Sequence, residues 1–161
     1  MKQIFESENI SFVEVSERLV ADYLAMVNDY EHVNRFIGGS HAVFTEEKEI
    51  SWVHKKLDAG APVFSMLEKK TGDFIGNIEL MDPTETEAEL GIAITAAKQD
   101  KGFGTEAVTA LVKYGLYGLG IKKIVLKTNP SNLRAIHVYR KCGFIETDRN
   151  EDHVFMEITR G

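Results

Sequence analysis

A glycine-containing loop is the first feature of the sequence whose residue types suggest chemistry. It runs from Gln99 to Thr105, between an expected strand and an expected helix. Gly102 and Gly104 let the backbone approach a ligand closely and adopt angles closed to other residues. The N–H groups in the first turn of the helix favour an anion, and Lys101 adds a positive charge. The loop therefore predicts a site for a phosphate or pyrophosphate.

The residues around this loop exclude two other phosphate-binding motifs. Gly102 to Ala107 fits the dinucleotide pattern G-x-G-x-x-A, but the first glycine follows the apolar run of the strand by about seven residues. The next strand ends in 127–129 (Lys-Thr-Asn), with no acidic residue to bind a ribose. No Lys-Ser or Lys-Thr follows Gly104, as a P-loop requires. On this loop alone, an anion site and a plain strand-to-helix turn are equally supported.

A second motif follows the next expected strand and occupies Asn129 to Phe144. Its residues from Asn132 onward read Asn-x-x-Ala-x-x-x-Tyr-x-Lys-x-Gly-Phe. Together with the upstream Gln-x-x-Gly-x-Gly, this order and spacing resembles the GNAT acetyltransferase superfamily, strongly so over about Ala88 to Phe144. The segments Ala88–Ile92 and Arg134–Ile136 resemble the branch that includes ribosomal-protein N-terminal and spermidine acetyltransferases.

The resemblance implies that acetyl-CoA wedges between two parallel strands that splay apart, at Glu89–Thr95 and Lys123–Thr128. The pantetheine arm would pair with the backbone of the first strand, and a backbone N–H at Ile92 or Ala93 would stabilise the developing oxyanion. The glycine loop would hold the pyrophosphate. The residues implied to bind acetyl-CoA are Ile92, Ala93, Ile94, Gln99, Asp100, Lys101, Gly102, Phe103, Gly104, Thr105, Asn132 and Ala135.

The resemblance also implies two proton transfers, one from the amine and one to the departing thiolate. Tyr139 matches the tyrosine that the superfamily places near the sulfur, and a phenol with a pKa of about 10 can protonate a thiolate whose conjugate acid lies near 8.5. Read alone, Tyr139 is better explained as a packing residue, whereas within the motif the general acid is favoured. Glu89 matches a glutamate that some members use as a base through a water. Glu79 on the preceding strand and bulk water are the alternatives.

Hydrophobic spacing predicts the elements that must position these residues. Ser16 is a plausible N-cap for the first helix, Gly38-Gly39 its end, and Thr45 the N-cap of the second. Helices are expected over about 16–37, 45–60, 104–119 and 132–142, and strands over 10–15, 63–67, 74–81, 87–95, 123–128, 144–147 and 154–158. With the resemblance, this order predicts an α/β (α+β) fold of GNAT type. Its central sheet is mixed, mostly antiparallel and splayed between two parallel strands, with helices on both faces.

Length and composition fit a single domain over 1–161, which the resemblance implies is an acetyltransferase domain. We expect the acceptor-binding part mainly in 1–60 and the acetyl-CoA-binding core at about 86–144. A single cysteine, Cys142, allows no internal disulfide, no apolar run is long enough to span a membrane, and the first residues lack the features of a signal peptide. These observations predict a cytoplasmic protein that does not contact membranes.

The net charge of −6 disfavours nucleic acid as a partner and suits a cationic amine. The five histidines show no metal-ligand spacing, so no metal is expected. The predicted activity is direct acetyl transfer from acetyl-CoA to a primary amine, of a small molecule or a peptide, in a ternary complex. A non-catalytic acyl-CoA-binding module is the alternative. The acceptor is not identified by any residue, and a homodimer is an expectation from the resemblance.

Overall fold

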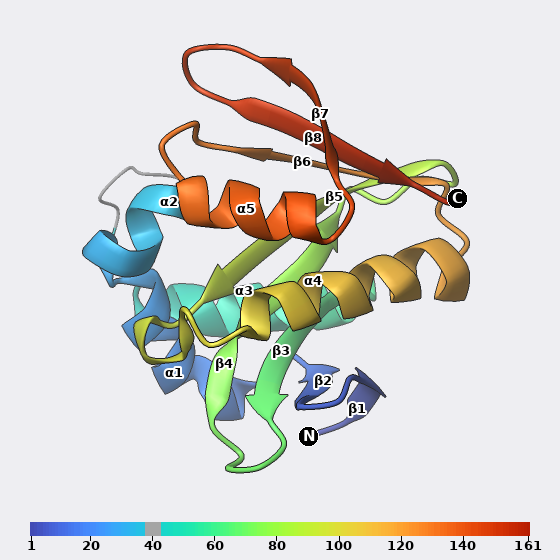
Figure 1. Cartoon of the computed structure of the whole chain (residues 1–161). Coiled ribbons are helices and arrows are strands. Elements are labelled where there is room, and N and C mark those ends of the chain that lie inside the picture. Colours follow the sequence, from blue (N-terminus) through green and yellow to red (C-terminus); the bar gives the residue numbers. More distant parts are fainter. Residues whose placement is uncertain (38–42) are drawn as a thin grey trace.

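The computed structural model describes residues 1–37 and 43–161, and its central feature is an eight-stranded sheet (Figure 1). The strands are β1 (Gln3–Glu6), β2 (Ile10–Glu14), β3 (Val63–Glu68), β4 (Phe74–Met81), β5 (Glu87–Ile94), β6 (Lys123–Thr128), β7 (Ile145–Arg149) and β8 (Val154–Thr159). The helices are α1 (Val20–Val27), α2 (Arg35–Ile37), α3 (Glu46–Ala59), α4 (Phe103–Lys113) and α5 (Leu133–Lys141). Short 3-10 or π segments are η1 (Glu17–Leu19), η2 (Tyr30–Asn34), η3 (Ala96–Lys98) and η4 (Tyr114–Gly118).

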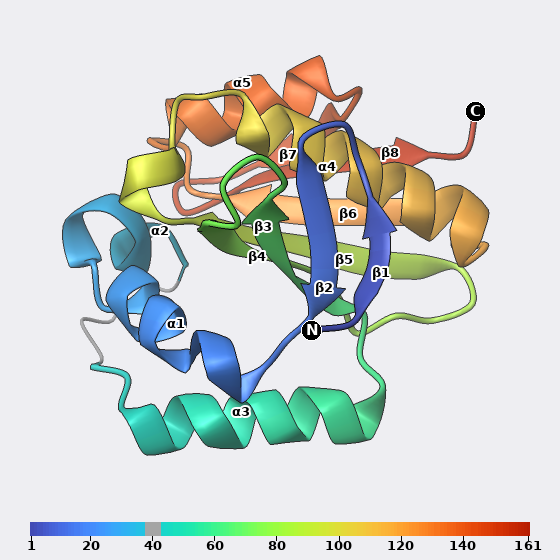
Figure 2. The same ribbon diagram turned by 90° about the horizontal axis from the view of Figure 1, so that it is seen from below.

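The sheet is mixed, with strand order β1-β2-β3-β4-β5-β6-β8-β7. Every neighbouring pair is antiparallel except β5 and β6, which run parallel. Figure 2 shows α1 and α3 on one face of the sheet and α4 and α5 on the other. Each face has its own apolar core, one of which extends to α4, α5 and the C-terminal strands. The predicted mixed, mostly antiparallel fold with helices on both faces is confirmed.

Helix α3 forms where its capping residues predict it. The Thr45 Oγ1 accepts a hydrogen bond from the Lys48 N–H at 3.3 Å, and Gly60 ends the helix in the left-handed conformation with φ of 60°. The first turn contains Glu46, Glu47 and Glu49, whose carboxylates interact favourably with the positive end of the helix dipole. The cap and charge signals were sufficient to fix both ends.

The single helix expected over 16–37 is wrong, because the chain breaks at Asn28 and Asp29. The side chain of Asn28 bonds both the N–H (2.8 Å) and the carbonyl (2.9 Å) of Phe44. The side chain of Asp29 caps the separate π segment η2 by accepting from the His32 N–H at 3.1 Å. Short polar side chains that bond nearby backbone compete with helix continuation. The expected stop at Gly38-Gly39 lies outside the described residues.

Two further elements differ from the sequence-based expectation. Strand β1 was not predicted, because its two central residues, Ile4 and Phe5, are both apolar and break the alternation of a half-buried strand. The helix expected to reach Leu119 is regular only to Lys113 and continues as the π segment η4. Leu119, the residue after this segment, is 45% exposed.

Candidate functional site

The parallel pair β5 and β6 separates after a short region of pairing. Glu87, Ala88 and Glu89 pair with 123–125 of β6, and the pairing ends there although β5 continues to Ile94. Backbone polar groups in a protein interior need hydrogen-bond partners. The unpaired part of β5 therefore presents a row of donors and acceptors to the gap, and the predicted splay between the parallel strands is confirmed.

The hydrogen bonds to β4 determine which β5 residues face this gap. The Thr95 N–H donates to the Ile75 carbonyl at 2.9 Å, just beyond the end of the β4–β5 ladder. Bonded and non-bonded residues alternate along an antiparallel pair. The alternation directs the backbone N–H and C=O of Ala93 towards β4, whereas those of Ile92 and Ile94 point towards the β6 side.

Gly76 on β4 allows the backbone of β5 to lie unusually close at this point. A Cβ at position 76 would lie 2.0 Å from the Ala93 carbonyl oxygen and 2.9 Å from the Ile94 Cα. No side chain is compatible with a backbone oxygen at that distance. Gly76 therefore sets the path of the β5 segment that borders the gap, which is the kind of close approach that glycine permits.

A cavity of about 240 Å³ continues from the gap between β5, α4 and α5. Apolar side chains from β5 and α5 form one part of its wall, and the glycine loop forms the other. Its lining residues are Ile92, Ile94, Lys98, Gln99, Asp100, Gly102, Gly104, Thr105, Val108, Arg134, Ala135, His137, Val138 and Tyr139. The structure thus brings the two sequence motifs to the same cavity.

The N-terminus of α4 opens into the loop without a side-chain cap. Gly102 is the N-cap residue, with φ of 88°, and has no side chain to satisfy the first N–H groups of the helix. Glu106, in the first turn, is held away by the β1–β2 turn, where its carboxylate accepts from the Asn9 backbone N–H at 2.8 Å and the Asn9 side chain at 2.9 Å. Uncapped N–H groups at a helix start suit an anion.

Two of the cations that line the cavity are paired with carboxylates. Lys98 donates to Glu68 at 2.8 Å and to Asp73 at 3.0 Å. The hydrogen bond to Glu68 is the main cause that raises the pKa of the Lys98 ammonium, and the bond to Asp73 adds to it. Arg134 faces Asp100 at 3.4 Å, and this pair joins the first turn of α5 to the glycine loop. Lys98 therefore anchors the loop to the β3–β4 hairpin, whereas the longer and more exposed Arg134 pair can exchange for another anion.

Tyr139 lies on α5 with its ring packed at 5.9 Å, edge-on, against Phe144. The residue is only 8% exposed, and burial raises the pKa of its phenol to about 12, with a smaller contribution from Cys142. Its hydroxyl has no hydrogen-bond partner within residues 1–37 and 43–161. The structure therefore holds a protonated phenol at the wall of the cavity.

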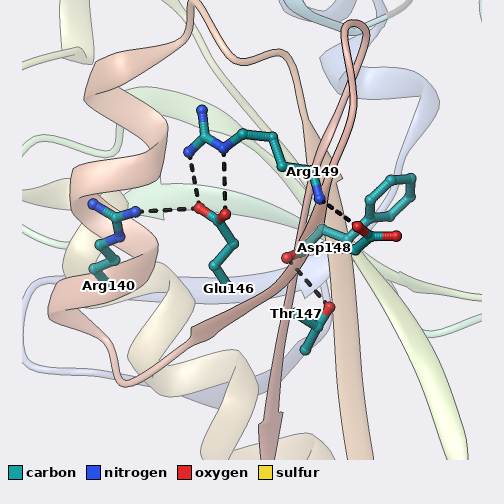
Figure 3. A network of polar contacts seen from close by, with 6 residues as sticks. Arg140, Glu146, Thr147, Asp148 and Arg149 are labelled. Atoms are coloured by element: carbon teal, nitrogen blue, oxygen red, sulfur yellow. Dashed lines mark hydrogen bonds and ion pairs between the residues drawn. The ribbon is translucent and has the colours of Figure 1, made fainter.

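A polar network on the outer side of α5 joins the helix that carries Tyr139 to β7 (Figure 3). Glu146 on β7 accepts from Arg149 at 2.8 and 3.3 Å and from Arg140 at 3.3 Å. Hydrogen bonding to Arg149 is the main cause that lowers the pKa of the Glu146 carboxyl. Because Arg140 is adjacent to Tyr139 in sequence, the network ties this turn of α5 to the β7–β8 hairpin.

Five residues named from the sequence do not line this cavity. Ala93 packs against the core on the α1–α3 face, and Phe103 packs into the core beneath α4. The Asn132 side chain caps α5 by accepting from the Ala135 N–H at 3.3 Å, and Lys101 is exposed. Glu89, the fifth, lies on the opposite face of the sheet.

Glu89 lines a separate cavity of about 280 Å³ beside the β4–β5 turn, together with Asp82 and Glu87. The alternative base, Glu79, lies on the same face as Glu89, and its Cγ would be 3.6 Å from a Cβ at Gly91. Glu79 also forms an ion pair with Lys56 of α3 at 3.5 Å. Both carboxylates are therefore separated by the sheet from the cavity that Tyr139 lines.

Five residues that line the cavity between β5, α4 and α5 were not predicted: Lys98, Val108, Arg134, His137 and Val138. Positions 134 and 138 are neighbours on the same helical face as Ala135 and Tyr139, because residues three and four apart adjoin on a helix. Ala135 and Tyr139 were predicted from the sequence, and a search for their neighbours on the same helical face would have found positions 134 and 138. Lys98 gives no such signal, because its place depends on the 3-10 segment η3.

Among the described residues, no group of three or more His, Cys, Asp or Glu side chains is arranged to hold a metal ion. The prediction that the protein uses no metal stays a prediction. No helix in the described part of the chain is long and apolar enough to cross a membrane.

Comparison with known proteins gives a family match over most of the chain. Residues 10–145 match the model of the acetyltransferase (GNAT) domain. The chain is 31% identical over 90 residues to an uncharacterized N-acetyltransferase, p20, of Bacillus licheniformis, covering 55% of this chain and 51% of that protein. It is 29% identical over 115 residues to the spermidine N(1)-acetyltransferase of Vibrio cholerae, covering 70% of this chain and 65% of that protein. The alignments thus span from about half to just under two thirds of these relatives.

Solved structures show the same fold over nearly the whole chain. A GNAT-family acetyltransferase from Bacillus anthracis aligns with a TM-score of 0.84 at 21% identity and covers 96% of both chains. A spermidine N-acetyltransferase from Vibrio cholerae in complex with CoA and spermine aligns with a TM-score of 0.85 at 20% identity. That alignment covers 95% of this chain and 96% of the other. The predicted GNAT-type fold agrees with these structures.

Proposed function

The chain belongs to the GNAT acetyltransferase family, and from this premise we propose that it transfers an acetyl group from acetyl-CoA to a primary amine. The transfer would be direct, within a ternary complex and without an acetylated enzyme. The observation that carries the proposal is the unpaired stretch of β5 after Glu89, whose far end at Ile94 lies beside the uncapped start of α4. One cavity thus offers strand-like backbone to an amide-containing arm and helix N–H groups to a pyrophosphate.

We assign the pantetheine arm to the β6-facing backbone groups of β5. The amides of pantetheine would pair with Ile92 and Ile94, and Ala135 leaves room for the arm beside α5. The Ile94 carbonyl already accepts from the Gln99 side chain at 2.9 Å, so Ile92 is the better acceptor for the ligand. The pyrophosphate would bind at Gly102 to Thr105, with Arg134 moving from Asp100 to the phosphates.

The Ile92 N–H is our candidate for the oxyanion donor. The amine nitrogen attacks the thioester carbonyl carbon, and negative charge develops on the carbonyl oxygen as the tetrahedral intermediate forms. A backbone donor aimed at that oxygen typically stabilises the transition state by about 3–4 kcal/mol. The sequence allowed Ile92 or Ala93, and the β4–β5 alternation favours Ile92.

Tyr139 is our candidate for the general acid. When the C–S bond breaks, the electron pair stays on sulfur, and the phenol proton passes to the thiolate. Because the pKa of its phenol is about 12, Tyr139 is protonated at neutral pH. The phenol is a weaker acid than an ordinary thiol, whose pKa is about 8.5, so the collapse of the tetrahedral intermediate must drive the proton transfer. The proton that the amine loses then restores the phenol by way of solvent, so the protons balance over one turnover.

The amine acceptor is proposed to approach from the face that carries Glu79 and Glu89, and to reach the thioester through the opening left where β5–β6 pairing ends after Glu89. Both carboxylates suit a cationic amine, and either could accept its proton through a water, although bulk water remains a sufficient alternative. The relatives named as spermidine acetyltransferases support a polyamine among the candidates. The cytoplasmic location and the homodimer stay predictions.

The proposal is tested by calorimetry followed by a thiol-release assay. We expect saturable binding of CoA but not of NAD or ATP. We also expect free thiol from acetyl-CoA in the presence of at least one member of a panel of polyamines, peptides with free N-termini and aminoglycosides. Absence of CoA binding would overturn the proposal. CoA binding without thiol release across the panel would instead support the alternative, a non-catalytic acyl-CoA-binding module.

A further inference from the structure

The side chain of Gln99 bridges two parts of the molecule that are far apart in sequence. Its Nε2 donates to the Ile94 carbonyl at 2.9 Å and to the His32 carbonyl at 3.1 Å. The two hydrogens of one amide nitrogen thus meet two backbone oxygens. Ile94 belongs to the strand that borders the cofactor gap, and His32 belongs to η2 in the predicted acceptor part.

The segment that Gln99 contacts is an irregular one. η2 is a single π-helical stretch, and such stretches occur frequently at functional sites. Its start is held by Asp29, whose carboxylate accepts from the His32 N–H at 3.1 Å and lies 3.0 and 3.1 Å from the His32 Nδ1. The backbone of His32 is therefore held on one side by Asp29 and on the other by Gln99.

The backbone of Gln99 is itself part of the cofactor loop. Its N–H donates to the Ala96 carbonyl at 3.2 Å, and the next residue, Asp100, is in the left-handed conformation with φ of 58°. Gln99 and Asp100 both line the CoA cavity. A ligand that fixes this loop and the end of β5 must also fix the amide that Gln99 presents to η2.

We propose that Gln99 is a positioning residue that couples occupancy of the CoA cavity to the order of η2. In this arrangement, CoA on the loop strengthens the Gln99–His32 contact and prepares the acceptor part before the amine arrives. By linkage, an acceptor that orders η2 tightens CoA binding by the same factor. The inference rests on the proposed function, because it takes CoA as the ligand of the cavity.

Hydrogen-exchange mass spectrometry with CoA alone tests the coupling without needing the acceptor. In the unchanged chain, saturating CoA should slow exchange of peptides covering 30–34 by about fivefold or more, the lower end of typical coupling between sites. Gln99→Met keeps the side-chain length but has no donor. At CoA concentrations that saturate each form of the protein, the variant should retain protection at 103–108 and lose the slowing at 30–34.

Two further variants separate coupling from damage to the fold. Gln3→Met makes the same replacement on β1, where the amide bonds only Glu6 at 3.0 Å in the described chain, and should leave the CoA effect intact. Gln99→Lys restores donors at the site and should recover part of the slowing. If circular dichroism shows that Gln99→Met is unfolded, Gln99→Glu, which also lacks donors, takes its place.

The outcomes distinguish this inference from the function on which it rests. CoA binding with unchanged exchange at 30–34 in the natural sequence overturns the coupling and leaves the proposed function standing. Equal slowing in the natural sequence and in the non-donor variant also overturns it. Absence of CoA binding by calorimetry overturns the proposed function, and the coupling falls with it.

Discussion

The two halves of the molecule are built by different means. The half proposed to bind CoA, here the CoA side, uses regular elements whose ends are set by single residues, such as Gly102 before α4, Asn132 before α5 and Gly143 after it. The half proposed to bind the acceptor, here the acceptor side, is assembled from the short pieces η1, α1, η2 and α2 before the longer α3. Backbone groups in regular elements suit a ligand that is always the same.

The polar groups buried in the two halves show the same contrast. On the acceptor side the Tyr23 hydroxyl lies 2.5 Å from the Ser65 hydroxyl, and the Asn34 Oδ1 is buried without a partner among the described residues. Glu49 is also buried there. On the cofactor side Tyr139 is the buried titratable group at the cavity. The acceptor side therefore buries more polar side chains. The following experiments test whether buried side chains or backbone geometry determine the turnover, the CoA affinity and the stability of the protein.

The largest effect is expected at Tyr139. Tyr139→Phe removes the proton donor but keeps the ring against Phe144, so kcat should fall about 100-fold, a common size for general acid catalysis. The KM for acetyl-CoA should stay within about threefold. Because the pKa of Tyr139 is raised to about 12, the natural chain should show no loss of kcat from phenol ionisation near pH 10. Steady-state kinetics against pH measure both, and unchanged kcat in the variant removes the assignment.

The second-largest effect is expected at Gly76 of β4, which should affect CoA binding more than any side chain of the glycine loop. Gly76→Ala places a Cβ against the Ala93 carbonyl, so β5 must move or the pair must open. We expect the free energy of unfolding to fall by about 1–3 kcal/mol, as for overpacked sites, together with weaker CoA binding. Urea titration and calorimetry measure the two effects.

Gly72→Ala is the control for the glycine itself, since it lies in an exposed turn where a Cβ meets nothing within 4 Å. Its cost should be limited to the strain of a positive φ, which is 79° at this residue. Equal effects of Gly76→Ala and Gly72→Ala on CoA affinity would contradict the role of the close β4–β5 approach.

A smaller effect is expected from the charge pair at the mouth of the cavity. Asp100→Asn keeps a residue that tolerates the left-handed conformation and removes a carboxylate that competes for Arg134. CoA affinity should rise, whereas Arg134→Gln should lower it, each by up to about fivefold for exposed charges. Calorimetry at two salt concentrations measures this, with Arg18→Gln on η1 as the control. A weaker affinity in Asp100→Asn would show that the loop needs the pair to stay folded.

The smallest expected effect concerns the stability of the acceptor side. Burial raises the pKa of Glu49, so the native state favours the protonated form, and stability is lost as pH rises through that pKa. Glu49→Gln should therefore raise Tm at pH 7.5 by about 2–4 °C, corresponding to about 1 kcal/mol in a chain of this size. The gain should disappear near pH 4, where the carboxyl is protonated.

Glu47→Gln is the matched control for that stability effect. Glu47 lies in the same first turn of α3 but is exposed, so both variants lose the same interaction with the helix dipole. Only the Glu49 variant should gain stability at pH 7.5. Equal melting temperatures in the two variants would contradict the cost of burying Glu49.

Sequence alone predicted the helices and strands of residues 86–144 well, because each signal there is local. Gly102 and Asn132 mark helix starts, and both belong to motifs whose spacing sets the order of strand, loop and helix. The failures came where tertiary contacts override spacing. The Asn28 side chain breaks the first helix by bonding Phe44, sixteen residues away in sequence. The cavity residue Lys98 depends on carboxylates of the distant β3–β4 region.

The roles of individual site residues show the same limit. The resemblance named Asn132 as a ligand contact, but its side chain is used in capping α5. Glu89 was placed on the correct strand, yet its side chain is on the face away from the Tyr139 cavity. Alternation along a strand shows which residues share a face of the sheet. It does not show which of the two faces borders the cavity, so the sequence could not place Glu89 relative to Tyr139.

The early end of the β5–β6 ladder also has a consequence for how long the protein survives. A ligand that completes the ladder binds the native chain and not the unfolded one, so each tenfold excess of ligand over its Kd adds about 1.4 kcal/mol to the free energy of unfolding. Proteases that attack the opened chain would then act more slowly when CoA is abundant. The supply of the ligand would set the half-life of the protein as well as its rate of turnover.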